Sequence, residues 1–225
     1  MSPSLVFLCL VVVPLLALCL FLKWNPGASG EWTLHLLLKT RLDKNRFRIL
    51  RDVMLPTDDG ATTQIDHVVV SPGGVLVIET KTYGNNRSGS CWIFGSASDR
   101  EWTASYPGGR KFRFQNPLRQ NYKHVATLAE CLGVPKEIFR SVVAFAGTAE
   151  FKTELPPEVM HFRDVPGYLL AHADDDLVKP EQVPEVAEAI LSWQATLSRK
   201  RRAAHVANLR KFHPDKGYDR DRYRH

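Results

Sequence analysis

Two apolar stretches that flank a tight turn dominate the sequence between residues 64 and 81. Their aliphatic and β-branched residues, separated by Pro72-Gly73-Gly74, predict a buried β-hairpin. Charged side chains interrupt this pattern at Asp66, Glu79 and Lys81. Because alternate residues of a strand face the same side, Glu79 and Lys81 are expected to share one face. Charges on such strands are rarely buried without a partner or a metal ion, so these three residues indicate a site.

The chemistry of the three charged residues favours metal-assisted hydrolysis. If the hairpin brings Asp66 beside Glu79, their two carboxylates form a seat for Mg²⁺ or Mn²⁺, since hard divalent cations prefer oxygen ligands. The backbone carbonyl of Thr80 is expected to complete this seat. Lys81 would then orient or deprotonate a water for attack on phosphorus, which makes Asp66, Glu79 and Lys81 the predicted catalytic residues. A salt-bridged strand end is the alternative for Glu79 and Lys81.

The spacing of Glu79 and Lys81, an acidic residue two positions before a lysine, recurs at Glu150 and Lys152. This pair lies in a polar stretch with no hairpin before it, so we interpret it as part of a solvated loop. The hairpin pair therefore differs from it in its apolar surroundings rather than in its spacing.

Three segments of the chain together resemble a known family. They are Gly30-Glu31, the run from Gln64 to Lys81, and Asn116-Pro117-Leu118-Arg119-Gln120-Asn121. In this order they are similar to the motifs of the nuclease-related domain (NERD) family, which is placed with the PD-(D/E)xK nucleases, and the match covers roughly residues 30–147. The resemblance implies an α/β fold with a restriction-endonuclease-like αβββαβ core and a mixed central sheet. In this chain we expect one transmembrane helix before that core.

The resemblance and helical spacing also suggest supporting site residues. Glu31 is a candidate third metal ligand, directly or through water, and the alternative is a first-turn glutamate stabilised by the helix N-terminus. Gln120 and His124 are four residues apart on one helix face and resemble a Gln-xxx-Tyr element with His in place of Tyr. They are predicted to contact the nucleic acid substrate. His67 points away from Asp66 and is interpreted as structural.

Hydrophobic periodicity predicts the same order of elements without the motifs. Helices are expected at residues 31–42, 116–132 and 180–197, a strand at 47–55 and a buried strand at 141–146, as well as the hairpin strands. Residues 83–113 are expected to form short strands and a long irregular excursion near the site. Trp92, Phe94 and Trp102 lie in this excursion, where they either anchor the loop in the core or stack on bases.

The N-terminal segment Leu5–Leu22 contains no charged residue and is just long enough to span a bilayer. No Lys or Arg precedes it, so an uncleaved anchor is favoured over a signal peptide, and the basic residues that follow place the C-terminal domain in the cytoplasm. The predicted organisation is an anchor at 1–24, a nuclease-like domain at 25–175, a helix at 176–198 and a basic tail at 199–225. Cys91 and Cys131 form no CxxC pair, which excludes a zinc ribbon.

The formal net charge of +6 comes from the tail. Residues 199–225 contain ten Lys or Arg against three Asp, whereas the remaining residues carry twenty basic against twenty-one acidic side chains. The tail is therefore expected to contact nucleic acid phosphates or anionic lipid, or to stay solvated.

Taken together, the sequence predicts a membrane-anchored, Mg²⁺- or Mn²⁺-dependent nuclease, with DNA favoured over RNA as its partner. The alternative is a catalytically inactive, membrane-tethered protein that binds nucleic acid or serves as a scaffold on the same fold.

Overall fold

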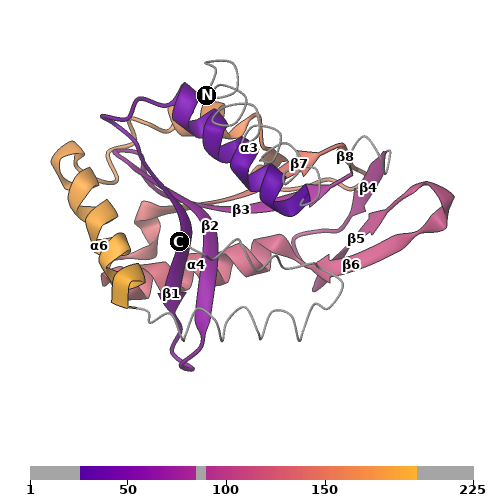
Figure 1. Ribbon diagram of the computed structural model, residues 1–225, viewed down its shortest axis with the longest axis horizontal. Helices are drawn as coiled ribbons and strands as arrows, with labels where there is room; N and C mark the ends of the chain where they lie inside the picture. The colour runs from indigo at the N-terminus through magenta and orange to yellow at the C-terminus, as the bar shows by residue number, and fades with distance from the viewer. Residues whose placement is uncertain (1–25, 85–89, 197–225) are drawn as a thin grey trace, which may run out of the picture.

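Figure 1 shows the computed structural model of the chain, which describes residues 26–84 and 90–196. The apolar segment 5–22 and the basic tail lie outside these residues. Within the described part, no helix combines the length and the apolar character that crossing a bilayer requires.

The central sheet has five strands in the order β1-β2-β3-β7-β9. Its strands are β1 (Arg48–Pro56), β2 (Thr62–Ser71), β3 (Gly74–Tyr83), β7 (Phe139–Gly147) and β9 (Val159–His161). The first three strands run antiparallel to their neighbours, and β3, β7 and β9 run parallel. The sheet is therefore mixed, and β3 lies at its centre, between the antiparallel and the parallel part.

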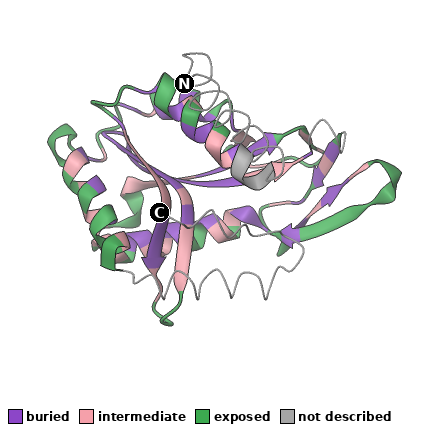
Figure 2. Cartoon of the chain, viewed as in Figure 1, coloured by how far each residue is buried: buried purple, intermediate pink, exposed green. Residues whose placement is uncertain are grey.

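Helices cover both faces of the central sheet (Figure 1). One face packs against α3 (Pro26–Arg41) and α5 (Val165–Ala171), and the other against α4 (Pro117–Leu132) and α6 (Val183–Thr196). Each face of β3 packs into one of two hydrophobic cores. Ile78 lies in the core on the α3 side, and Val77 lies in the core on the α4 side. Residues of β2 and β3 are accordingly buried along most of their length (Figure 2).

A second sheet of four strands, in the order β6-β5-β4-β8, projects beyond the central sheet (Figure 1). Its strands are β4 (Cys91–Phe94), β5 (Glu101–Ser105), β6 (Lys111–Gln115) and β8 (Ala149–Phe151). Trp102 is fully buried in it and stacks on Phe145 of β7, with ring centroids 6.2 Å apart. On β3, the ring of Tyr83 stacks on Phe114 of β6 at 4.5 Å. The second sheet is thus attached where β3 and β7 end.

The order α3, β1, β2, β3, α4, β7 agrees with the periodicity of the sequence, and the fold is a mixed α/β fold with two mixed sheets. The helix predicted at 31–42 begins earlier, at Pro26, and the one predicted at 180–197 begins with a 3-10 turn, Pro180–Gln182, before α6. The region 83–113 contains short strands as expected, but they assemble into a sheet. Trp102 anchors this region, whereas the side chain of Phe94 is 43% exposed.

Local sequence explains how α4 and the hairpin are positioned. The Asn116 side chain caps α4 by accepting a hydrogen bond from Leu118 N, and Pro117 occupies the first turn, as predicted. Gly74 adopts φ 108° at the tip of the hairpin, a conformation that favours glycine. Gly30 lies so close to β3 that a Cβ there would meet Thr82 Oγ1 at 2.1 Å. The motif glycine therefore lets α3 approach the strand that carries the predicted site.

Candidate active site

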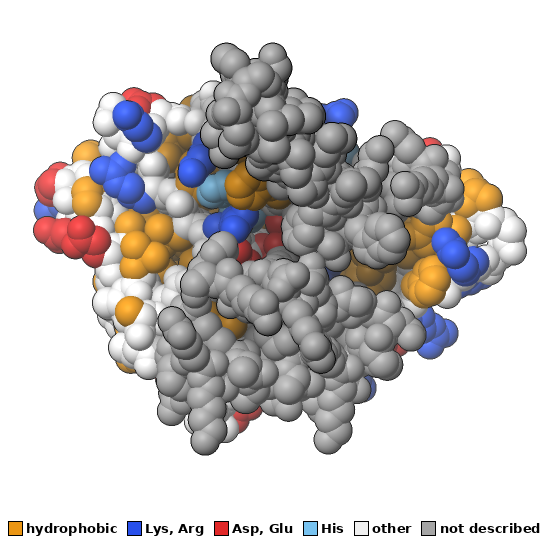
Figure 3. All heavy atoms as spheres, in the orientation of Figure 1, with side chains coloured by type: hydrophobic (Ala, Val, Ile, Leu, Met, Phe, Trp, Pro, Cys, Tyr) orange, Lys and Arg blue, Asp and Glu red, His pale blue; other side chains and the backbone are white. Residues whose placement is uncertain are grey.

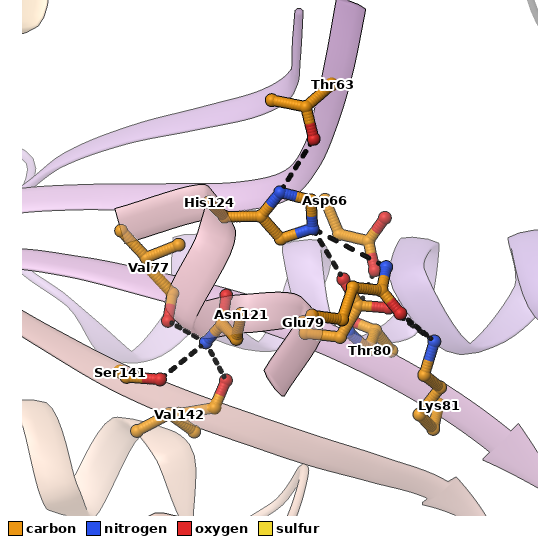
Figure 4. A network of polar contacts seen from close by, with 11 residues as sticks. Thr63, Asp66, Val77, Glu79, Thr80, Lys81, Asn121, His124, Ser141 and Val142 are labelled. Carbon is orange, nitrogen blue, oxygen red and sulfur yellow. Dashed lines mark hydrogen bonds and ion pairs between the residues drawn. The ribbon is translucent and has the colours of Figure 1, made fainter. Parts of the chain in front are cut away.

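The hairpin strands separate at the position of the two predicted carboxylates. Pairing between β2 and β3 extends to His67 and Ile78, and Asp66 and Glu79 are the next residues on each strand. There Asp66 Oδ2 accepts a hydrogen bond of 2.8 Å from the backbone N–H of Thr80 (Figure 4). The side chain of Asp66 is thereby fixed across the opening of the hairpin, next to the backbone that carries Glu79.

Glu79 and Lys81 point to the same face of β3 and form an ion pair there. Lys81 Nζ lies 2.5 Å from Glu79 Oε1 and donates a second hydrogen bond of 2.9 Å to Gln120 Oε1 on α4. The side chains of Lys81 and Glu79 are only 12% and 4% exposed. The ammonium group is therefore held between a carboxylate of the hairpin and an amide of the helix (Figure 4).

His124 connects the other oxygen of Glu79 to β2. Its Nε2 lies 3.3 Å from Glu79 Oε2, and its Nδ1 lies 2.9 Å from the hydroxyl of Thr63. With the proton on Nε2, the ring accepts from the hydroxyl and turns its N–H toward the carboxylate, although this second contact lacks the geometry of a hydrogen bond. Since His124 is 4% exposed, it fixes Glu79 from the interior rather than facing solvent.

The environment affects the two carboxylates in opposite ways. Burial and the nearby charge of Glu79 raise the pKa of Asp66 well above its ordinary value, although Thr80 N–H and Lys81 oppose this shift. Burial also acts to raise the pKa of Glu79, but the charge of Lys81 and the contact with His124 outweigh it and lower this pKa to about 2. In this carboxylate pair the pKa values diverge, and the pKa of Asp66 rises through burial and through repulsion by Glu79; a bound cation would relieve both effects.

The Glu150–Lys152 pair has the same spacing as Glu79 and Lys81 but lies in an exposed environment. Its ion pair, 2.9 Å long, joins side chains that are 55% and 43% exposed. Glu150 lies on β8 rather than in the predicted loop, and the predicted solvent exposure is confirmed. Burial between the hairpin and α4, not the spacing, distinguishes the candidate site.

The donor set fits a divalent cation through two carboxylates. Asp66 and Glu79 provide hard oxygen ligands, and Glu79 Oε2 is buried and accepts no hydrogen bond of good geometry from the described residues. Within residues 26–84 and 90–196, no three His, Cys, Asp or Glu side chains group closely enough to hold a metal ion. Glu31 is half-buried on α3, so its role as a third ligand stays a prediction.

The structure brings five of the six predicted site residues into one network, namely Asp66, Glu79, Lys81, Gln120 and His124. Gln120 and His124 are directed at Lys81 and Glu79, and their predicted contact with substrate is untested. Sequence reasoning missed Thr63, which fixes the His124 ring. A threonine at the start of a strand gives no signal of such a contact 61 residues away.

His67, interpreted from the sequence as structural, lies on the opposite face of the sheet. It is fully buried, its ring stacks on that of His35 at 5.6 Å, and neither ring nitrogen has a hydrogen-bond partner among the described residues. Burial, followed by the charges of His35 and Arg51, lowers the pKa of His67 to about 3. The folded protein therefore holds this imidazole in its neutral form at neutral pH.

Acid is expected to destabilise the fold through His67. The unfolded chain binds a proton near pH 6.5 and the folded chain only near pH 3, so stability is lost as the pH falls through this window. At pH 5 the loss relative to pH 7.5 should be about 2 kcal/mol. Urea unfolding at both pH values tests this, with His67→Leu as the comparison. An equally steep pH dependence in the variant would contradict the assignment.

Comparison with known proteins places the chain in a family. The pattern of the nuclease-related domain (NERD) matches residues 26–146, more than half of the chain. The chain belongs to the nuclease-related domain family. It is also 40% identical over 106 residues to an uncharacterized protein of Bacillus anthracis. This alignment covers 47% of the chain and 46% of the relative, so the chain matches less than half of that protein's length.

Proposed function

We propose that the chain is a metal-dependent phosphodiesterase that hydrolyses nucleic acid, with DNA as its first expected substrate. The observation that carries this proposal is the convergence of Asp66, Glu79 and Lys81 at the point where β2 and β3 separate. Membership of a nuclease-related family supports the same chemistry. The element order α3, β1, β2, β3, α4, β7 supports a restriction-endonuclease-like core.

Each residue has a definite part in this proposal. Asp66 and Glu79 would hold Mg²⁺ or Mn²⁺, and a bound cation would offset the negative charge that develops on the phosphoryl oxygens. Lys81 Nζ donates a hydrogen bond to the attacking water and favours its ionised form. Gln120 and His124 hold Lys81 and Glu79 in place, because Gln120 Oε1 contacts Lys81 Nζ and His124 Nε2 contacts Glu79 Oε2.

A second candidate function is a scaffold that retains the hairpin without catalysis. It is favoured by the ion pair of Lys81 with Glu79, which already neutralises one carboxylate, and by the lack of a third close ligand among the described residues. In that case the network would serve only to join α4 to the hairpin.

Calorimetric titration and a cleavage assay together test the proposal. The full-length chain should bind Mn²⁺ or Mg²⁺ with site-specific heat and degrade DNA, and Asp66→Asn should abolish both. Asp59→Asn, at an exposed turn, serves as the matched control and should leave both unchanged. Normal metal binding by Asp66→Asn, or the absence of metal-dependent cleavage by the parent protein, would leave the scaffold as the better account.

Membrane attachment through Leu5–Leu22, with the catalytic domain in the cytoplasm, is part of the same proposal. It rests on the apolar character of that segment and on the basic residues after it. Alkaline extraction of membranes tests it, because a spanning segment resists extraction and a peripheral protein is released.

A further inference from the structure

The projecting sheet carries a concentration of positive charge that the rest of the described domain lacks. Residues 90–119, which we call the basic arm, contain five Lys or Arg against two Asp or Glu. The other described residues contain thirteen Lys or Arg against nineteen Asp or Glu. A basic extension on an otherwise acidic domain is expected to attract a polyanion to the extension specifically.

Exposed aromatic side chains accompany this charge. Strands β4, β5 and β6 turn their buried side chains, such as Trp102 and Phe114, toward the core. Phe94, at the end of β4, is instead 43% exposed and lines a hollow of about 510 Å³ on the solvent face of the sheet. Arg100 and Arg113 line the same hollow. Figure 3 shows hydrophobic and basic side chains side by side over this projecting end of the molecule.

The hollow itself is balanced in charge, so the net attraction for a polyanion comes from the rest of the arm. Asp99, which accepts a hydrogen bond of 2.7 Å from the backbone N–H of Ser96, and Glu101, which is exposed at the start of β5, offset Arg100 and Arg113. The other charged residues of the arm, Arg110, Lys111 and Arg119, are all positive. Arg110, outside the hollow, lies over the rings of Tyr106 and Phe112, which keeps another cation on the arm in a fixed place.

The N-terminal part of α4 connects the hollow to the candidate active site. Asn116 donates to the backbone carbonyls of Ser96, Ala97 and Asp99, which binds the rim of the hollow to the start of that helix. Arg119 adds a hydrogen bond to Ser98 O, and the next residue, Gln120, contacts Lys81. Asn116 and Gln120 are one helical turn apart on α4, so a single turn of this helix contacts both the rim and the ammonium group of the site.

We propose that the basic arm binds an unpaired nucleic acid strand next to the active site, with a base stacked on Phe94 and phosphates at Arg100 and Arg113. This inference rests on the proposed nuclease function and assigns its preferred substrate as single-stranded. An open aromatic face can stack on a base only when that base is free of its duplex neighbours, whereas cations alone would bind both forms.

Binding measured without metal tests this independently of catalysis. The full-length chain in EDTA is titrated into a fluorescent single-stranded oligonucleotide and, separately, into the matching duplex. Phe94→Ala should weaken single-strand binding about five- to a hundredfold and duplex binding little, and Phe94→Trp should restore it. Arg113→Ala should weaken both and make single-strand binding less dependent on salt.

Controls separate this inference from the proposed function. Trp193→Ala removes a comparably exposed aromatic ring from α6 and should bind like the parent protein. Lys179→Ala removes an exposed lysine outside the arm and should bind single strands normally in EDTA. Unchanged binding by Phe94→Ala, or an equal loss for duplex, overturns the inference even if the protein cleaves DNA. A Phe94-dependent loss in a protein that cleaves nothing supports the strand-binding arm and rejects the nuclease.

Discussion

Lys81→Ala is expected to lower metal-dependent cleavage of DNA by at least about a hundredfold, within the range that one positioned proton-transfer group contributes. The reason is geometric, because Lys81 Nζ is fixed between Glu79 and Gln120 at 2.5 and 2.9 Å. The variant has no donor at this point to orient a water. Initial rates with Mg²⁺ and Mn²⁺, measured on a single-stranded substrate, give the size of the loss.

The same substitution also removes the lysine partner of Glu79, a buried carboxylate that then keeps His124 as its ion-pair partner among the described residues, so part of the effect would be on folding. Lys81→Arg separates the two contributions. Arginine retains the positive charge and therefore the ion pair, but its planar guanidinium cannot replace a compact ammonium as a water ligand. We expect its melting temperature to stay near that of the parent protein while its cleavage stays low.

Lys179→Ala provides the matched control, since it removes an exposed lysine from the segment before α6. It should cleave at the parent rate. If Lys81→Ala and Lys81→Arg are both folded and both cleave like the parent, Lys81 has no part in catalysis and the ion pair is structural.

The sequence predicted the hairpin, because two apolar, β-branched runs on either side of Pro72-Gly73-Gly74 leave little choice of structure. That pattern also placed Glu79 and Lys81 on one face, which the structure confirms. The start of α4 was predictable for a similar local reason, as Asn116 and Pro117 form a cap and a first turn. Features that depend on residues close together in the sequence could thus be predicted from the sequence.

The second sheet was not predictable in the same way. Its strands β4, β5, β6 and β8 have only three to five residues, too few for a clear period, and β8 joins β4 from nearly 60 residues away. The network around Glu79 could not be predicted from the sequence either, because Thr63 and His124 come into contact only when α4 packs across the hairpin. These features follow from tertiary packing, which overrides local preference.

Loss of the Asn121 side chain should strongly destabilise the fold. It is fully buried in α4, and its Nδ2 group lies within hydrogen-bond distance of Val77 O on β3 and of Ser141 Oγ and Val142 O on β7, at 2.9, 2.9 and 3.1 Å (Figure 4). One side chain thereby joins the helix of the candidate site to both parallel strands at the centre of the sheet. Although the sequence motif contains Asn121, its position alone gave no indication of this role.

Asn121→Leu is expected to lower the free energy of unfolding by about 2–4 kcal/mol. Leucine fills a similar volume but donates no hydrogen bond, so two buried carbonyl groups lose a partner, each at a cost of about 1–3 kcal/mol. For a domain of this size the melting temperature should fall by roughly 5–15 °C. Thermal and urea unfolding, followed by circular dichroism, measure both quantities.

Two comparisons show whether the hydrogen bonds themselves are responsible. Ser141→Ala removes only one of the three acceptors and should cost about 1 kcal/mol or less. Asn45→Ala alters an exposed asparagine, for which the structure gives only a backbone hydrogen bond, and should have little effect. A loss in Asn121→Leu no larger than that in Asn45→Ala would mean that packing, not this side chain, joins α4 to the sheet. The position of Gln120 and His124 beside the candidate site would then have to depend on the apolar contacts of α4, such as those of Val125 and Leu128.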